Sequence, residues 1–284
     1  MGWRTVVVNK NCKLSYKNDY LIIRSENLQM IHLSEINLII IENGMVSITS
    51  ELINNKIKLV FCDEKHNPAA ELIPYYGSFN TSKKILKQTQ WKGNRKDLVW
   101  QQIVKNKIHN QAAILKELKI ENYEKLLEFE EKVLPGDSTN REGHAAKVYF
   151  NLLFGKKFIR GEDNYINNSL DYGYAIILST MNKEIVSKGY ITQLGINHRS
   201  EFNQFNLACD LMEPFRPLVD KIVYENSNLE LNRNQKYKLI DVLNNKVEIG
   251  NKEQYVGNAI PIYIQSVFDS LESEKEIKIL NYEL

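Results

Sequence analysis

Hydrophobic and polar positions follow two different periods along this chain. Over the first eighty residues, short β-branched runs alternate with turn signals such as Asn54-Asn55, which predicts strands. The runs cover residues 5–8, 20–23, 30–33, 38–41 and 58–61, and residues 50–53 are expected to form a single helical turn. Strands this short, with so little helix between them, favour an antiparallel sandwich or roll.

From Thr81 onward, apolar residues recur every three or four positions, which is helical spacing. Further helices are predicted at about residues 121–134, 138–154, 168–188, 203–224, 233–243 and 256–273. The fold class is therefore expected to be α+β. An N-terminal antiparallel β-sandwich domain over residues 1–78 would be followed by a larger all-α-helical C-terminal domain over residues 79–284.

The composition is that of a soluble globular protein, with 43% apolar and 25% charged residues. The three cysteines lie far apart, which argues against a disulfide framework and against a structural zinc site. The N-terminus lacks the apolar core of a signal peptide, and no apolar run approaches the ~18 residues needed to span a bilayer. We therefore expect a cytoplasmic protein without membrane contact.

The charges are distributed unevenly although the net charge is only +2. Residues 81–110 carry eight lysines and arginines against one acid, and residues 117–131 are then acidic. Such asymmetry suggests a face for a polyanion. Phosphate contacts with aromatic stacking on Trp91 and Trp100 are one interpretation, and a solvated helix face is the other. Residues 155–161 form a second basic patch.

The most informative segment is residues 195–220, where His198 follows a loop that begins with a glycine. Asp210 and Glu213 are three residues apart, so a helix would place them on one face. Two carboxylates and an imidazole suit a hard or borderline divalent cation. The alternative is structural. His198 would be a hydrogen-bonded residue, and Asp210 would cap a helix beginning at Pro214, in which Glu213 pairs with Arg216.

Glu142 has a similar pair of interpretations. It lies in the first turn of a predicted helix, and Thr139 and Glu142 together fit the Ser/Thr-x-x-Glu pattern of a capping box. In that case its carboxylate would satisfy backbone donors. The other interpretation is metal ligation, and the residues alone leave both open.

Three segments, taken together, resemble the Cas1 family of CRISPR-associated integrases and endonucleases, in the version found in type II systems. The first is Arg141-Glu142-Gly143-His144-Ala145-Ala146. The second is Gly195-Ile196-Asn197-His198, similar to the family's Gly-x-x-His. The third is Asp210-Leu211-Met212-Glu213-Pro214-Phe215-Arg216, similar to its Asp-Leu-x-Glu-Pro-Phe-Arg. The resemblance covers essentially the whole chain.

The resemblance implies an active site and a reaction. Glu142, His198 and Glu213 would be the catalytic residues and would hold Mg²⁺ or Mn²⁺, with Asp210 as a supporting acid. The implied reaction is a transesterification, in which the 3′-hydroxyl of a short DNA fragment attacks a phosphodiester at the edge of a CRISPR repeat. The resemblance also implies double-stranded DNA as substrate, a homodimer formed through the β domain, a dimer of the small partner Cas2, and further type II adaptation proteins.

Charge and position, rather than the matched motifs, suggest which residues contact DNA. The candidates are Lys84, Lys87, Arg95, Lys156, Lys157, Arg160 and Arg199. Two other functions compete with integration. One is a metal-dependent DNA endonuclease that hydrolyses branched or single-stranded DNA, and the other is a catalytically silent DNA-binding scaffold. The charges of the C-terminal tail, residues 272–284, are expected to be solvated.

Overall fold

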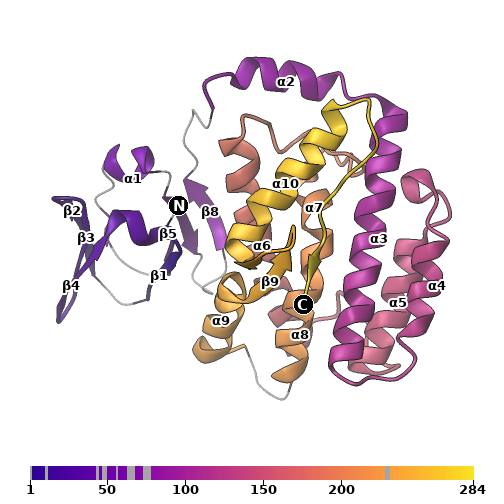
Figure 1. Cartoon of the computed structure of the whole chain (residues 1–284). Coiled ribbons are helices and arrows are strands. Elements are labelled where there is room, and N and C mark those ends of the chain that lie inside the picture. Colours follow the sequence, from indigo (N-terminus) through magenta and orange to yellow (C-terminus); the bar gives the residue numbers. More distant parts are fainter. Residues whose placement is uncertain are drawn as a thin grey trace. The chain divides into compact units, whose positions relative to one another are not determined.

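The structure is a computed structural model that describes residues 2–9, 12–42, 45–46, 50–55, 57–62, 68–72, 78–227 and 231–284. The chain divides into two compact units, residues 1–77 and residues 78–284. Strands dominate the first unit, and helices dominate the second (Figure 1). The change in hydrophobic period near Thr81 therefore marks a real change in architecture.

Two four-stranded sheets make up the described part of the N-terminal unit. One has the order β1 (Arg4–Val8), β5 (Ile36–Ile41), β7 (Lys58–Cys62) and β8 (Pro68–Leu72). The other has the order β4 (Leu28–His32), β3 (Tyr20–Arg24), β2 (Lys13–Lys17) and β6 (Met45–Val46). The short helix α1 (Ser50–Asn54) confirms the predicted helical turn, and a 3₁₀ turn, η1 (Leu33–Glu35), precedes β5. The strands β2, β6 and β8 were not predicted.

The expectation of purely antiparallel pairing is wrong for both sheets, and most clearly for the first. Its strand β5 pairs in parallel with both β1 and β7, with Val8 opposite Ile41 and Leu59 opposite Ile39. The reason lies in β5 itself, whose last four residues are all buried instead of alternating. A strand that is buried on both faces is typical of a parallel sheet. In the second sheet, β2, β3 and β4 are antiparallel, and β6 joins β2 in parallel.

Both sheets contribute side chains to one hydrophobic core. Leu14 and Leu21 come from the second sheet, and Ile39 and Leu59 come from the first. Each is at most 1% exposed. Burial of large aliphatic side chains contributes about 1.5–3 kcal/mol each, so this shared core is what holds the two sheets together.

The C-terminal unit is built around a long helix, α3 (Gly93–Glu117), which packs against α4, α5, α8 and α10. Its inward stripe includes Trp100, Ile103 and Ile114, all at most 2% exposed. No helix within the described ranges is both long and apolar enough to cross a membrane. The other helices are α2 (Thr81–Thr89), α4 (Glu124–Glu131), α5 (Arg141–Phe154), α6 (Tyr165–Ser187), α7 (Asn206–Met212), α8 (Arg216–Glu225), α9 (Arg233–Ile240) and α10 (Val256–Glu272), with 3₁₀ turns η2 (Pro135–Asp137), η3 (Glu213–Phe215) and η4 (Asp241–Asn244).

The expectation of an all-helical C-terminal domain is wrong in one respect. Three strands, β9 (Lys246–Ile249), β10 (Glu253–Tyr255) and β11 (Tyr282–Glu283), form an antiparallel sheet. The last of them lies in the C-terminal tail, whose charges were expected to be solvated; the side chain of Glu274 is 88% exposed, but that of Glu272 is only 18% exposed. Tyr282 is buried, and its hydroxyl donates a hydrogen bond of 2.9 Å to the carbonyl oxygen of Pro214. The tail is therefore anchored beside η3.

Close packing of α6 against α8 leads to a first prediction. A Cβ built at Gly173 would lie 2.4 Å from Cγ1 of Val219. Because the added methyl group would overpack this contact, we expect Gly173→Ala to lower the free energy of unfolding by about 1–3 kcal/mol. In the double variant with Val219→Ala the two losses should be less than additive. Denaturant unfolding of all four chains measures this, and strictly additive losses would contradict the assigned contact.

Candidate active site

The start of α5 leaves the carboxylate of Glu142 available for another role. Asp137 accepts the N–H groups of Arg141 and Glu142, at 2.8 and 3.0 Å, and Asn140 accepts that of Gly143 at 3.2 Å. These two side chains cap the helix. The capping-box interpretation of Glu142 is therefore wrong, because its side chain instead contacts an ammonium group of α3.

Glu213 is placed by an interrupted helical segment. The chain runs through α7, the 3₁₀ turn η3 and α8 in succession, with Pro214 in the turn and Pro217 in the first turn of α8. The side chain of Glu213 is only 5% exposed, and its Oε1 accepts a hydrogen bond of 2.9 Å from Nε of Arg216. The predicted pair of Glu213 and Arg216 is therefore confirmed, although the helix begins at Arg216 rather than at Pro214.

One lysine joins the two acids. The Nζ atom of Lys107, on α3, lies 2.6 Å from Oε1 of Glu142 and 2.5 Å from Oε2 of Glu213. Glu142 and Glu213 are seventy-one positions apart in the chain, yet both contact the same cation. The structure thus brings together two of the three residues that the sequence suggested for metal binding.

Asp210 organises the loop that carries His198. Its carboxylate accepts the backbone N–H groups of Ile196, Asn197 and His198 at 2.6, 3.0 and 3.0 Å. A Cβ at Gly195 would lie 2.4 Å from the carbonyl oxygen of His198 and 2.7 Å from Oδ2 of Asp210, so this close approach requires glycine. Asp210 is therefore an anchor inside α7, and the interpretation of it as the cap of a helix beginning at Pro214 is wrong.

The ring of His198 is oriented by the same carboxylate. Its Nδ1 lies 2.5 Å from Oδ1 of Asp210, and the ring meets Trp100 edge-on at 6.0 Å between centroids. An ionised carboxylate only accepts hydrogen bonds, so Nδ1 is the donor. In the neutral imidazole this leaves Nε2 as the lone-pair nitrogen, which is the arrangement that metal-binding histidines commonly have.

The charges of the site favour the ionised form of Glu213. Burial acts to raise the pKa of Glu213, but Arg216 and Lys107 together hold that pKa below its ordinary value. Burial acts to lower the pKa of Lys107, and the carboxylates of Glu213 and Glu142 outweigh it, so the pKa of Lys107 is raised. The hydrogen bond to Asp210 raises the pKa of His198, with smaller contributions from Glu213 and Glu142. The histidine is therefore within electrostatic range of both acids.

The donor set fits a divalent cation, although the side chains do not yet converge on one point. Within the described ranges, no three His, Cys, Asp or Glu side chains stand together at metal-binding distance. Glu142 and Glu213 nevertheless already share a cationic group, and the imidazole of His198 is oriented by Asp210 within electrostatic range of both acids. Oxygen and imidazole donors suit Mg²⁺ or Mn²⁺. Their role as metal ligands stays a prediction.

A cavity of about 550 Å³ opens beside His198. Lys96 and Arg199 line it, together with Phe202, which is 97% exposed. Burial, with the nearby charge of Arg199, lowers the pKa of Lys96. Two cations and an aromatic ring around a cavity are features of sites for nucleic-acid backbone and bases.

Comparisons with known proteins agree with these motifs. The chain matches the family model described as CRISPR associated protein Cas1 over residues 5–241. It is 36% identical to the CRISPR-associated endonuclease Cas1 of Neisseria meningitidis serogroup C over 261 residues, which are 88% of this chain and 86% of that relative. The chain belongs to the Cas1 family. A Cas1 of Pyrobaculum aerophilum is 27% identical over 77% of this chain and 80% of the relative.

Solved structures show that the Cas1 fold extends over nearly the whole chain. A casposase bound to an integration product superposes with a TM-score of 0.77 at 21% identity, covering 97% of this chain and 92% of that one. A Cas1 protein from Thermotoga maritima superposes with a TM-score of 0.60 at 19% identity, covering 97% and 98%. At such identities the likeness shows the fold alone.

Two lysines of this Cas1-family site, Lys96 and Lys107, were not among the predicted site residues. Lys107 was counted within a basic segment that was expected to face either a polyanion or solvent, but it is only 9% exposed. The signal was present in the helical spacing. Lys107 lies four positions after Ile103 and four before Gln111, both of which are fully buried, so its side chain follows the apolar stripe of α3. A cation on such a stripe requires buried acids.

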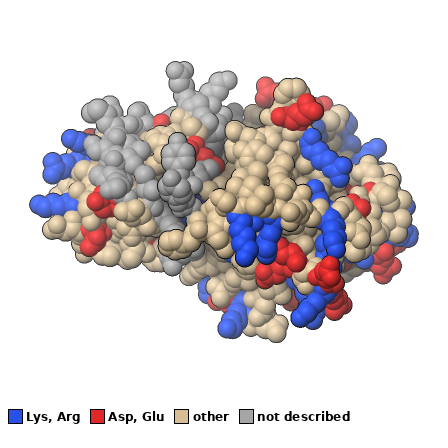
Figure 2. Space-filling view, turned by 90° about the horizontal axis from the view of Figure 1, so that it is seen from above, with Lys and Arg blue, Asp and Glu red and all other residues tan. Residues whose placement is uncertain are grey.

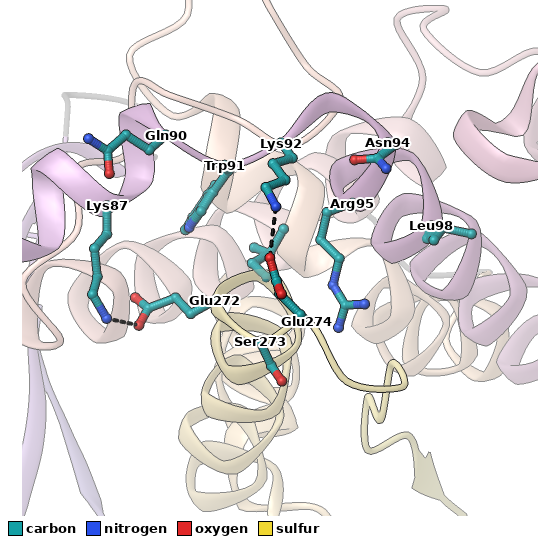
Figure 3. Close-up of a pocket in the computed structure, with 11 residues that line it drawn as sticks. Lys87, Gln90, Trp91, Lys92, Asn94, Arg95, Leu98, Glu272, Ser273 and Glu274 are labelled. Atoms are coloured by element: carbon teal, nitrogen blue, oxygen red, sulfur yellow. Dashed lines mark hydrogen bonds and ion pairs between the residues drawn. The ribbon is translucent and has the colours of Figure 1, made fainter.

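Three of the predicted DNA contacts, on α2 and α3, bind to residues near the end of α10. Lys87 lies 2.8 Å from Oε2 of Glu272, and Lys84 lies 3.3 Å from Oε1 of the same residue. Arg95 donates from Nε to the carbonyl oxygen of Ser270 at 2.6 Å. Figure 3 shows Lys87 of α2 and Arg95 of α3 directed toward the C-terminal end of α10, around a cavity of about 430 Å³. Any DNA contact by Lys84 or Lys87 must therefore compete with Glu272, and one by Nε of Arg95 must compete with the carbonyl oxygen of Ser270.

The other predicted DNA contacts differ in exposure. Lys156 and Lys157 are exposed in the turn after α5, whereas Arg160 pairs with Asp171. Arg199 is exposed and lies on the cavity beside His198. In the view from above, Lys and Arg side chains of the helical unit are interspersed with Asp and Glu (Figure 2). DNA binding by all seven residues stays a prediction.

The loop anchor gives a second prediction. Asp210→Asn keeps the shape of the side chain but replaces one accepting oxygen with an amide that cannot accept. We expect a loss of about 2–4 kcal/mol in unfolding free energy, because buried backbone donors lose a charged partner. The pKa of His198 should also fall, since the bond to Asp210 raises it. Denaturant unfolding and an NMR titration of the imidazole measure both. Glu201→Gln, in the same loop but exposed, is the control, and an effect of equal size there would contradict the prediction.

A buried acid on α8 gives a third prediction, on pH. Burial raises the pKa of Asp220 to about 6, although Tyr174 donates a hydrogen bond to it. The folded chain thus binds this proton more tightly than the unfolded chain, so the contribution of Asp220 to stability falls as pH rises from about 4 to 6. We expect the unfolding free energy of Asp220→Asn to increase relative to that of the wild type by about 2–3 kcal/mol when the pH is raised from 4 to 7. Denaturant unfolding at both pH values checks this, and a pH-independent difference would contradict it.

Proposed function

We propose that this Cas1-family chain is a CRISPR adaptation integrase that joins short DNA fragments to the repeat array by metal-dependent transesterification. The observation that carries the proposal is the convergence of Glu142 and Glu213 on one cationic position, with His198 oriented by Asp210 within electrostatic range of both acids. The chemistry of the site supports it, because phosphoryl transfer needs charge stabilisation rather than a nucleophilic side chain.

Each residue has a defined part in this proposal. Glu142 and Glu213 supply carboxylate oxygens and His198 supplies Nε2, while Asp210 keeps the histidine in the correct tautomer. A bound Mg²⁺ or Mn²⁺ would stabilise charge on the attacked phosphoryl oxygen and favour deprotonation of the 3′-hydroxyl. Lys96 and Arg199 hold the phosphate backbone at the cavity beside His198.

We also propose the partners that the family resemblance implies. The chain forms a homodimer through its β unit, joins a Cas2 dimer, and acts with further type II adaptation proteins in the bacterial cytoplasm. A Cas6-RT-Cas1–Cas2 complex has a chain that superposes on this one with a TM-score of 0.71, covering 97% of this chain and 36% of that one. This likeness supports a Cas1 fold that is compatible with such an assembly. Double-stranded DNA, as fragment and as repeat, is the proposed substrate.

Hydrolysis is the second candidate, because the curated relative from Neisseria carries the name endonuclease. The same carboxylates and histidine would serve, with water in place of the 3′-hydroxyl. The two reactions differ in what must be present on the fragment. A fragment whose 3′ end is blocked cannot be integrated, whereas hydrolysis of branched DNA does not use that end.

The proposed ligands give a fourth prediction. We expect Glu142→Ala, His198→Ala and Glu213→Ala each to reduce strand transfer into a repeat-bearing supercoiled plasmid by roughly 100-fold or more, the scale on which loss of transition-state charge stabilisation acts. The assay is run in Mn²⁺ with Cas2 present, and Glu128→Ala, an exposed acid on α4, is the control.

Two outcomes would contradict the proposal. If all three variants transfer strands as the wild type does, the chain acts as a DNA-binding scaffold. If a 3′-blocked fragment leaves the yield of cut plasmid unchanged, the reaction is hydrolysis.

A further inference from the structure

The ammonium group of Lys107 lies in the part of the molecule where a metal ion is expected. The side chain of Lys107 is 11% exposed, and its partners Glu142 and Glu213 are 24% and 5% exposed. The contacts of Nζ are short, at 2.6 Å to Oε1 of Glu142 and 2.5 Å to Oε2 of Glu213. One oxygen of each acid is used. Arg216 neutralises the other oxygen of Glu213. Both oxygens of Glu213 and one oxygen of Glu142 thus contact cations that belong to the protein.

Charge balance explains why a protein cation is needed. A carboxylate that is removed from water without a partner costs several kcal/mol. Two such groups facing one another would also repel each other across a medium of low dielectric. Lys107 relieves both penalties, so Glu142 and Glu213 can stay close together in a folded chain that holds no metal.

Geometry makes the ammonium and a metal ion alternatives. Mg²⁺ holds oxygen ligands at about 2.0–2.1 Å. An ion bonded to Oε1 of Glu142 and Oε2 of Glu213 would therefore lie in the space that Nζ of Lys107 occupies. Two cations in that space would overlap and repel each other, so one of them must leave.

We propose that Lys107 is a built-in substitute for the metal ion, which holds Glu142 and Glu213 together in the metal-free chain and is displaced when a divalent ion binds. The inference rests on the proposed metal site. Its consequence is that metal binding is an exchange of cations, so the site is preformed without metal and its affinity is lowered by the competition.

The test compares Lys107→Met with the wild type. Methionine keeps a long apolar stem without the charge. Lys105→Met is the matched control, because it removes a lysine from the same helix two positions away. The Mn²⁺ dissociation constant is measured by isothermal titration calorimetry, and thermal unfolding is followed in EDTA and in Mn²⁺. Glu142→Ala and Glu213→Ala are titrated alongside.

We expect Lys107→Met to bind Mn²⁺ at least about tenfold more tightly than the wild type, since removing a competing charge at this distance is worth more than a factor of ten. In EDTA, the melting temperature of Lys107→Met should be lower than that of Lys105→Met. Addition of Mn²⁺ should raise the melting temperature of Lys107→Met by more than it raises that of the wild type. Unchanged or weaker binding by Lys107→Met would overturn the inference.

The controls separate this inference from the proposed function. If the wild type does not bind Mn²⁺, or if Glu142→Ala and Glu213→Ala bind it as well as the wild type does, the proposed metal site itself is wrong. If both acid variants lose binding while Lys107→Met does not gain it, the metal site stands and the exchange with Lys107 is wrong.

A measurement on the wild type covers the case in which Lys107→Met does not fold. Lysine acetylation is quantified by mass spectrometry in EDTA and in Mn²⁺. Lys107 should be protected in EDTA and labelled several times faster in Mn²⁺, because its ammonium has left the acids, while labelling of Lys105 stays constant. Equal protection of Lys107 in both conditions would overturn the exchange.

Discussion

Two carboxylates that are largely removed from water, Glu142 at the start of α5 and Glu213 in η3, meet at the ammonium of Lys107 on α3. The arrangement of the helical unit around the site depends on this contact, because buried like charges stay together only around a cation. The contact connects three segments that are far apart in the chain. It also makes the site suitable for a divalent ion, since a pair of acids that accommodates one cation can accommodate another.

Residues around this contact cap the neighbouring helix and anchor the neighbouring loop, so the functional side chains do not have to form those hydrogen bonds. Asp137 and Asn140 cap α5, so Glu142 has no backbone donors to satisfy. Asp210 gathers three backbone N–H groups of the His198 loop and orients the ring. The tail supports η3 from outside, through the hydroxyl of Tyr282 on the carbonyl of Pro214. Rigid support of this kind is what a metal site requires of its surroundings.

Much of the fold could be predicted because strands and amphipathic helices repeat with different periods, and the change at Thr81 divides the two units. The parallel pairing of β5 was missed although its unbroken apolar run carried the signal. The strand β11 could not be predicted, because its two residues adopt this conformation only where the folded chain offers β9 and Pro214 as partners.

The motifs predicted Glu142, Glu213 and His198 as one group, but the capping of α5 by Asp137 depends on a turn that no spacing rule describes. Lys107 could have been found from the apolar stripe of α3.

The most direct test of the account is a crystal structure of the wild-type chain soaked in Mn²⁺, with the ion located by its anomalous scattering. The account predicts one ion that contacts a carboxylate oxygen of Glu142, a carboxylate oxygen of Glu213 and Nε2 of His198. An ion that binds elsewhere, or one that leaves any of these three side chains out of contact, would contradict the shared metal site.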